Sequence, residues 1–556
     1  MFRNKKVLIA VLGFVALAVL LIGCAAGEEK ATPTAAAQTP IQGTPIAAVT
    51  SQPKSGGTLR LAVSADPAQH DPQRDVGQYT WWQRVGSELV NFRYGPEVDY
   101  YDLTPAPDLA ESWEVSADGL TYTFHLRQGL KWQNKPPVNG REMVASDVKF
   151  TFDRLFRVAK NLYGYQLGDV KSIETPDNYT VKFTLGSVYA PFLTHIANYW
   201  GVILPPECEE KIEGGFAKVE SIIGTGPFTL ESYQPNVGVV FKRNPTYFRS
   251  PLPYLDEVRE TILADSSTRQ AAVRAGNLDI GSASVITLDS MIKTNPELTV
   301  MTHQGSLQGW AIAMRSDKPP FDDVRVRQAV ALAIDRQQWV DSLYLGYGVV
   351  DNGPIPVGMK AWKLPTDQLG EGAKYFSYNP EEARRLLAEA GYPNGFATTY
   401  TTHSPATYGD AADLIVDMLS KVGIKVTIKP MDYPAWLASV ASGAKYEGMS
   451  ISTQWTILDP DLTFWGFYYP GQATNISVTN DPTLNAMMEK QRRLMDYGER
   501  KKVTDEIQRY LTVQNYRIPC PAGFGFTLVQ PWVRDYYPKV WGDVGRIREL
   551  IWLDKK

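Results

Sequence analysis

The residues with the clearest capacity for chemistry lie in the segment that runs from Trp455 to Trp465. Asp459 and Asp461 flank a proline there, and their carboxylates could hold a cationic group or cap the helix that follows. The two tryptophans add flat rings that can stack on an organic solute. Two alternatives stay open at this point: the aspartates contact a ligand, or they only cap a helix.

Patterns for catalysis and for metal binding are missing from the sequence. No G-x-S-x-G, H-E-x-x-H or P-loop occurs. Residues 223–228 (IGTGPF) could be mistaken for a phosphate-binding loop, but the Lys-Ser/Thr pair is absent and Pro227 removes a donor N–H. The five histidines form no i,i+4 pair, and there is no Cys-x-x-Cys. We therefore expect no zinc or other metal and no cofactor.

Length and charge limit the class of protein. A chain of 556 residues is too long for one core, so we expect two or more lobes. Apolar residues make up 44% and charged residues 21%, as in globular proteins. The net charge of −4 argues against a nucleic-acid partner, which would require a basic face.

The N-terminus has the features of a lipoprotein signal peptide. Three basic residues precede an apolar run, residues 7–22, and a small residue then precedes Cys24. We interpret residues 1–24 as the signal and Cys24 as the lipidated first residue of the mature chain; a lone membrane-spanning anchor is the alternative. Residues 25–53 are rich in Ala, Thr, Pro and Gln, which predicts a flexible linker.

The mature chain alternates between strand and helix patterns. Residues 56–63 predict a turn and an alternating strand, and Asp118-Gly119 predicts a hairpin turn between two strands. In residues 319–336, Asp322 or Asp323 precedes an apolar run at helical spacing and can cap it. In residues 379–391, an Asn-Pro start and a Gly end predict another helix.

Several separated segments resemble, in order, those of the peptide/nickel-type extracellular solute-binding proteins, family 5. Members of this family are substrate-binding lipoproteins of ABC importers and include dipeptide- and oligopeptide-binding proteins. The resemblance covers roughly Gly56 to the C-terminus. The matching segments are 56–59 (GGTL), 109–132 (LAESWEVSADGLTYTFHLRQGLKW), 224–228 (GTGPF), 244–248 (NPTYF), 319–336 (PPFDDVRVRQAVALAIDR) and 378–392 (YNPEEARRLLAEAGY).

The resemblance implies an α/β chain with the two-lobed periplasmic-binding-protein fold, type II, cluster C. An extra subdomain is expected in the first lobe. After the linker, residues 54–92 form the first segment of lobe I, 93–199 the extra subdomain, 200–303 the second segment of lobe I, 304–511 lobe II, and 512–556 the last segment of lobe I.

The resemblance also supplies candidate ligand contacts. Tyr79, Trp81 and Trp82 occupy a region that faces the cleft in relatives, although they could instead pack within the lobe. Arg315 stands where the family usually has Asn; it either meets a ligand anion or forms an ion pair at the surface.

Peptide-binding relatives hold the free amine of the peptide with an Asp that closely follows the Trp corresponding to Trp455. Here the intervening stretch is shorter and apolar, with Ile457 and Leu458. Either Asp459 supplies the clamp after a shift or the clamp is missing, so an oligosaccharide or opine becomes an alternative to a free peptide. Asp461 and Trp465 complete the predicted ligand-binding set.

The expected partners are a peptide or other small solute, the permease subunits of an ABC importer, and a membrane reached through the lipid; a monomer is expected. Cys208 and Cys520 either form a disulfide or stay free. A secreted hydrolase, which would need two facing carboxylates, and a purely structural surface lipoprotein are the alternatives from other classes.

Overall fold

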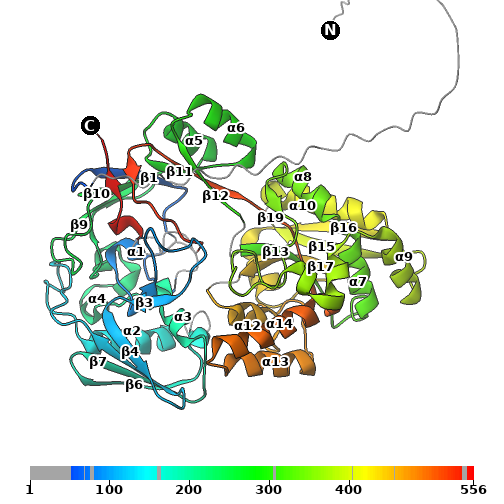
Figure 1. The fold of residues 1–556 in the computed structure, drawn as a ribbon, viewed down its shortest axis with the longest axis horizontal. Coiled ribbons are helices and arrows are strands. Elements are labelled where there is room, and N and C mark those ends of the chain that lie inside the picture. The colour runs from blue at the N-terminus through cyan, green and yellow to red at the C-terminus, as the bar shows by residue number, and fades with distance from the viewer. Residues whose placement is uncertain are drawn as a thin grey trace, which may run out of the picture. The chain divides into compact units, whose positions relative to one another are not determined.

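The structure is a computed structural model, and its helices and strands form several mixed α/β layers (Figure 1). Regular elements follow the predicted alternation of strand and helix along the chain. The residues that the structure describes are 52–67, 69–74, 81–158, 164–304, 308–403, 405–455, 458–540 and 547–555.

A four-stranded sheet contains the first strand of the described residues. Its order is β1 (Thr58–Val63), β10 (Glu257–Ile262), β9 (Gly238–Arg243) and β8 (Phe228–Gln234). β1 pairs with β10 in parallel, and the other neighbours are antiparallel. Leu59 and Leu61 alternate into the core, which confirms the strand predicted after the Gly-Gly turn.

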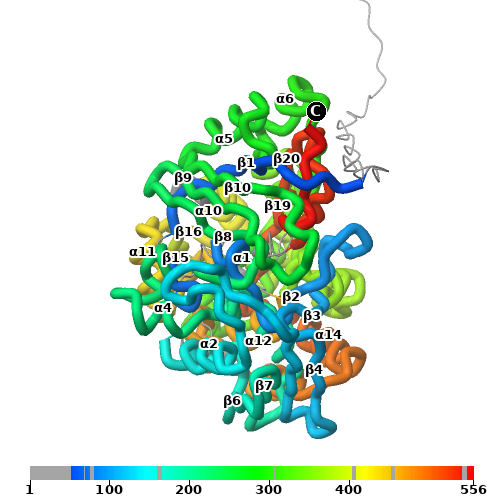
Figure 2. Tube along the Cα trace, turned by 90° about the vertical axis from the view of Figure 1, so that its left-hand side faces the viewer, coloured from blue at the N-terminus to red at the C-terminus, as the bar shows by residue number. Residues whose placement is uncertain are grey.

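A separate antiparallel sheet is built from β4 (Ala110–Val115), β5 (Thr121–Leu126), β7 (Thr180–Leu185) and β6 (Val170–Asp177), in that order. The hairpin predicted at Asp118-Gly119 is confirmed: Val115 pairs with Tyr122, and Gly119 adopts a φ of 70°. Helix α2 (Ala145–Val158) packs on β6 and β7 (Figure 2).

The largest sheet has the order β16 (Ile424–Met431), β15 (Phe396–His403), β17 (Met449–Trp455), β13 (Gln308–Met314) and β18 (Arg517–Pro519). β15 is parallel to both β16 and β17, and β13 is antiparallel to β17. Around it lie α7 (Val324–Ala333), α8 (Arg336–Tyr344), α9 (Pro380–Glu389) and α10 (Pro405–Ser420), as Figure 1 shows.

Both predicted caps in this region of the chain are present. The Asp323 side chain accepts the Arg325 N–H at the start of α7, and Asn379 accepts the Glu382 N–H at the start of α9. Gly391, just beyond α9, has a φ of 92°, a conformation that favours glycine.

Three helices follow the last parallel strand: α12 (Pro460–Tyr468), α13 (Pro482–Arg492) and α14 (Tyr497–Gln514). A small sheet of β11 (Ile280–Ala283), β20 (Gly525–Val529) and β12 (Thr299–His303) completes the main layers. Because β18 pairs with β13, and β19 (Ala522–Gly523) pairs with β14 (Gly348–Val349), we propose that the last segment of the first lobe begins after Gly523 rather than at residue 512.

Candidate functional site

Asp459 is the N-cap of α12 and the partner of a buried arginine. Its Oδ1 accepts the Asp461 N–H at 2.8 Å, and Pro460 occupies the first helical position. The Arg500 guanidinium, from α14, donates to both carboxylate oxygens, with Nη1 2.8 Å from Oδ2. Both side chains are almost fully buried, so the capping alternative holds and this carboxylate is already neutralised by a bidentate cation.

Asp461, in the first turn of the same helix, has three partners. The Tyr189 hydroxyl donates to Oδ2 at 3.0 Å, and the Gln491 amide donates to Oδ1 at 2.5 Å. Arg492 Nε lies 3.3 Å from Oδ1. Burial raises the pKa of Asp461, and the charge of Arg492 partly opposes that shift. Its oxygens are therefore occupied by protein groups from α13 and from the segment that follows β7.

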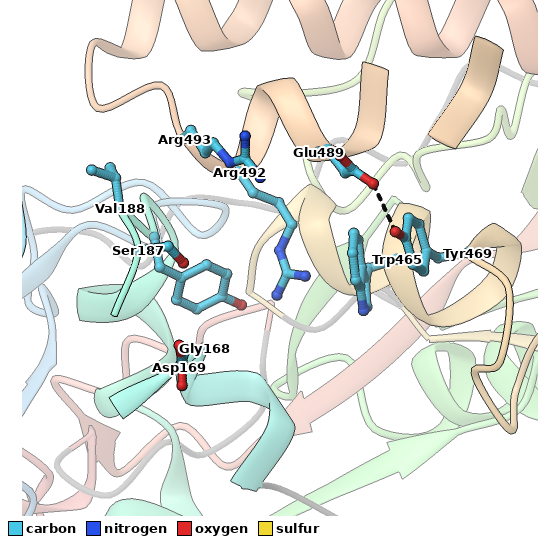
Figure 3. Close-up of a pocket in the computed structure, with 10 residues that line it drawn as sticks. Gly168, Asp169, Ser187, Val188, Trp465, Tyr469, Glu489, Arg492 and Arg493 are labelled. Atoms are coloured by element: carbon cyan, nitrogen blue, oxygen red, sulfur yellow. Dashed lines mark hydrogen bonds between the residues drawn. The ribbon is translucent and has the colours of Figure 1, made fainter. Parts of the chain in front are cut away.

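Trp465 lies on α12 beside a cavity of about 450 Å³ (Figure 3). Its indole stacks on Tyr469 with 3.5 Å between ring centroids, and the Arg492 guanidinium carbon lies 3.8 Å from the indole centroid. Tyr469 in turn donates to Glu489 at 2.7 Å. Because Tyr469 and Arg492 pack on its ring, Trp465 forms part of the cavity wall and offers little free surface for stacking on a ligand.

The far side of this cavity comes from the antiparallel-sheet region. Asp169, Ser187, Val188 and Tyr189 line it opposite the α12 and α13 residues. The Ala190 N–H also donates to the Arg492 carbonyl at 2.8 Å. The predicted segment 455–465 is thus attached, through α12 and α13, to a distant region of the chain.

An aromatic cluster, which we call the edge cluster, lies where the parallel strands of the largest sheet end. It consists of Trp310, His403, Tyr433 and Trp436. His403 is the last residue of β15, and its ring centroid lies 4.3 Å from Trp436, 5.1 Å from Tyr433 and 6.5 Å from Trp310. Tyr433 is 45% exposed whereas Trp436 is buried. Ligands of α/β proteins commonly bind outside the carboxyl ends of such strands.

The first sheet has a smaller cavity, about 240 Å³, at the carboxyl end of β1. Val63, Arg269, Tyr536 and Arg548 are among the residues that line it. Both sheets therefore present polar and aromatic side chains at the ends of parallel strands.

The chain is similar to known solute-binding proteins over most of its length. A family model for the bacterial extracellular solute-binding proteins, family 5, middle region, matches residues 104–475. The chain belongs to this family. Members are the solute-binding components of ABC importers, so the predicted class of function is confirmed, as is an extracytoplasmic location.

Two curated relatives match most of this solute-binding protein. Heme-binding protein A of Haemophilus influenzae is 30% identical over 492 residues, which cover 83% of this chain and 85% of that protein. Di/tripeptide-binding protein 1 of Pseudomonas aeruginosa is 31% identical over 495 residues, or 84% and 87% of the two chains.

A solved structure extends the likeness to the fold. The ABC transporter-associated periplasmic binding protein DppA of Helicobacter pylori, in complex with the peptide STSA, has a TM-score of 0.75 at 27% identity. The match covers 90% of this chain and 99% of that chain. The predicted two-lobed type II fold is therefore confirmed.

The predicted aromatic contacts near the N-terminus of the solute-binding protein are core residues where the structure describes them. Trp81 is 3% exposed, and its ring stacks on His70 at 5.3 Å. Trp82, equally buried, donates from Nε1 to the His70 carbonyl at 2.6 Å. Tyr79 lies outside the described residues, as does the side chain of Trp455, whose backbone ends β17. Trp81 and Trp82 therefore pack within the lobe, which was the alternative to a ligand contact.

Arg315 is held by its own lobe. Its guanidinium forms a bidentate pair with Asp317, at 2.6 and 2.7 Å, and donates to the carbonyls of Ala444 and Tyr446 at 3.0 Å each. The ion-pair alternative describes this residue, although the pair is more buried than a surface bridge, with 12% of the arginine side chain exposed.

Cys208 and Cys520 are separate free thiols. Cys208 is buried in the hydrophobic cluster of the first lobe, and Cys520 is buried in the cluster around the largest sheet. The disulfide alternative is thus not realised, because the two side chains belong to different cores. Cys24 lies outside the described residues.

Neither a metal-binding cluster nor a membrane-spanning helix occurs in the described ranges. No group of three or more His, Cys, Asp or Glu side chains there is placed to hold a metal ion. Among the helices of those ranges, none combines the length and apolar character that crossing a bilayer requires.

Sequence reasoning missed the edge cluster and the cavity beside Trp465. His403 stands at the end of a predicted strand, and the aromatic residues Tyr433 and Trp436 follow the next strand. Because parallel strands bring such positions to one edge, the strand order would have placed them together. Tyr189 and Arg492 carried no comparable signal, since their contacts join segments about 300 residues apart in sequence.

Proposed function

We propose that this protein captures a peptide or a similar organic solute by hinge closure and passes it unaltered to the permease of an ABC importer. The match to a di/tripeptide-binding relative and to a peptide-bound neighbour, over most of each chain, carries this proposal. The edge cluster supports it, because aromatic rings with a few polar groups are the usual lining of a solute site.

The hydrogen bonds of Asp459 and Asp461 limit the ways in which this protein could recognise a peptide. Both Asp459 oxygens accept from Arg500, and both Asp461 oxygens have partners within the protein. An ammonium buried without a counter-charge costs several kcal/mol, so neither residue serves as the amine clamp in this arrangement. A peptide would be recognised here through its backbone and side chains.

The same observation favours a second candidate ligand. An oligosaccharide or an opine needs no carboxylate clamp for a free terminal amine and can stack on aromatic rings. If the purified protein releases an oligosaccharide or an opine instead of a peptide, the proposed transport role stands and only the class of ligand changes.

We propose that the protein works as a monomer, tethered outside the cytoplasm by lipid on Cys24, without catalysis and without a metal or cofactor. The linker 25–53 would let the lobes reach the permease from the lipid anchor.

Mass spectrometry tests the proposal directly. Protein purified gently and then denatured should release an intact peptide or other organic solute, and adding that solute back should raise the melting temperature. Steady conversion of the released molecule by the purified protein would favour the hydrolase alternative. A protein that releases no solute and is not stabilised by a peptide and sugar library would contradict the binding role.

A further inference from the structure

The strongest contacts between the antiparallel-sheet region and the helices α12 and α13 centre on three side chains. Tyr189 belongs to the hydrophobic cluster of the first lobe and its subdomain, whereas Asp461 and Arg492 lie on α12 and α13. Tyr189 is 3% exposed and Asp461 is 1% exposed. A buried hydrogen bond to a charged group is among the stronger single contacts in a protein.

Arg492 packs against a ring on each side. Its guanidinium carbon lies 4.8 Å from the Tyr189 centroid and 3.8 Å from the Trp465 centroid, while Nε is 3.3 Å from Asp461. The Nε–H has no hydrogen-bond partner among the described residues. The main chain adds the Ala190 N–H bond to the Arg492 carbonyl, so two segments are joined by side-chain and backbone contacts at one point.

This contact point is continuous with a buried polar network. Gln491 donates to Asp461 from its amide nitrogen and accepts from Arg500 with its amide oxygen, at 3.0 Å from Nε and 2.9 Å from Nη2. Arg500 in turn holds Asp459. Tyr189 therefore terminates a chain of hydrogen bonds that otherwise lies within the second-lobe helices, and this chain fixes the direction of the Asp461 carboxylate.

The adjoining cavity does not itself look like an anion site. Of the two arginines that line it, Arg493 is exposed and Arg492 pairs with the Asp461 carboxylate. The Trp465 ring is packed against Tyr469 and Arg492. The arrangement is better suited to holding two walls together than to receiving a charged ligand.

We propose that Tyr189, Asp461 and Arg492 form an interlobe latch that stabilises the closed form of the protein and so sets solute affinity without touching the solute. This proposal rests on the proposed function, because a latch matters for affinity only if the solute is held by closure. Separating the lobes would break the Tyr189 bond and the Ala190 bond together and expose Asp461 to water. These three side chains are positioning residues, not ligand contacts.

Removing one hydroxyl group tests the latch. Tyr189→Phe keeps the ring beside Arg492 and deletes only the donor to Asp461. The matched control is Tyr469→Phe, which deletes a tyrosine-to-carboxylate bond of the same kind, to Glu489, on the wall of the same cavity but within one lobe. The melting temperature of each variant should stay close to that of the parent protein, which would show that the fold is retained.

Closure is measured without any ligand. Spin labels on Asn178→Cys and Lys425→Cys, both exposed positions, report the distance between the subdomain and the far strand of the largest sheet. We expect Tyr189→Phe to reduce the ratio of the short-distance to the long-distance population about tenfold, and Tyr469→Phe to leave it unchanged. An unchanged distribution in Tyr189→Phe would overturn the latch whatever the solute proves to be.

Affinity is then measured with the peptide STSA as the probe. If this peptide binds, Tyr189→Phe should raise its dissociation constant about tenfold, mainly through a faster off-rate. Equal off-rates in the two variants would overturn the link between latch and affinity. If STSA does not bind the parent protein, that result counts against the peptide proposal, and the distance measurement alone decides the latch.

Discussion

Asp459 and Asp461 stand two residues apart yet have different surroundings. Asp459 pairs with Arg500 inside the second lobe, whereas Asp461 accepts from Tyr189 of the first-lobe subdomain. Side chains that suggested a ligand clamp in the sequence are thus fully used by the protein itself. Their roles could not be separated beforehand, because Arg500 and Tyr189 lie far away along the chain.

Loss of the Asp459 charge should be costly. Asp459→Asn leaves the Arg500 guanidinium buried without its carboxylate, which we expect to lower the free energy of unfolding by about 3–5 kcal/mol. Urea unfolding followed by tryptophan fluorescence measures it. Glu382→Gln, in an exposed pair with Arg385, serves as the control and should cost less than about 1 kcal/mol. Equal effects of the two substitutions would contradict the buried-pair interpretation.

His195 should make stability depend on pH. Its ring is fully buried, stacks on Tyr189 at 5.9 Å, and has no hydrogen-bond partner on either nitrogen among the described residues. The pKa of His195 is lowered from 6.5 to about 4, chiefly by burial; the charge of Asp459 opposes the shift, and the charges of Arg500 and Arg492 add to it.

The direction of the pH dependence follows from which state of the protein, folded or unfolded, binds the proton. Between pH 6.5 and about 4 the unfolded histidine takes up a proton that the folded one refuses, so unfolding becomes easier as the pH falls through this window. The loss contributed by this group is about 3 kcal/mol and ends below the folded pKa. His195→Leu should flatten the pH dependence of unfolding free energy by that amount. A parallel pH profile in the variant would contradict the assignment.

At the scale of elements, caps and turns were predictable because their signals are local. Asn379 and Asp323 cap the helices that follow them, and Asp118-Gly119 turns a hairpin, as the sequence indicates. The edge cluster was not predictable in the same way, since it depends on the order of strands in the sheet. Residues 456–457, which separate Trp455 from the turn that contains Asp459, lie outside the described residues.

The exposed ring of the edge cluster offers a test of its role. Tyr433→Ala should weaken binding of the solute identified by mass spectrometry about five- to tenfold, because one stacking surface is lost. Calorimetric titration measures the change. Tyr378→Ala, which removes a similarly exposed ring elsewhere in the second lobe, is the control and should bind as the parent does. Equal affinities in all three proteins would remove the edge cluster from the site.

At the scale of the whole molecule, the family resemblance predicted fold and transport class, because separated motifs in a fixed order specify a topology. Tyr189 could not be predicted as the partner of α12 and α13, because it lies in the subdomain and shares no motif with them. Solute identity was also beyond reach, because the edge cluster that we propose as part of the solute site is assembled by the strand order and not by a local motif.

The lipid anchor that we propose at Cys24 is testable at the same scale. We expect Cys24→Ala to release the protein into the medium or to leave the precursor uncleaved, because the lipid can no longer be attached. Fractionation and intact-mass measurement distinguish these results from the parent. Retention on the membrane at mature size would contradict lipidation at this residue, and Cys208→Ala provides the control for loss of a thiol.

The buried thiols of Cys208 and Cys520 have a use for the experimenter. Each stands in a different hydrophobic cluster, and burial raises the pKa of both thiols to about 12, so a maleimide should react with neither while the fold holds. Under rising denaturant, single-cysteine variants should report which half of the protein loses its core first. Added solute should slow both labelling rates if the halves are coupled through the bound molecule, and a protein with two such native thiols needs no introduced cysteine.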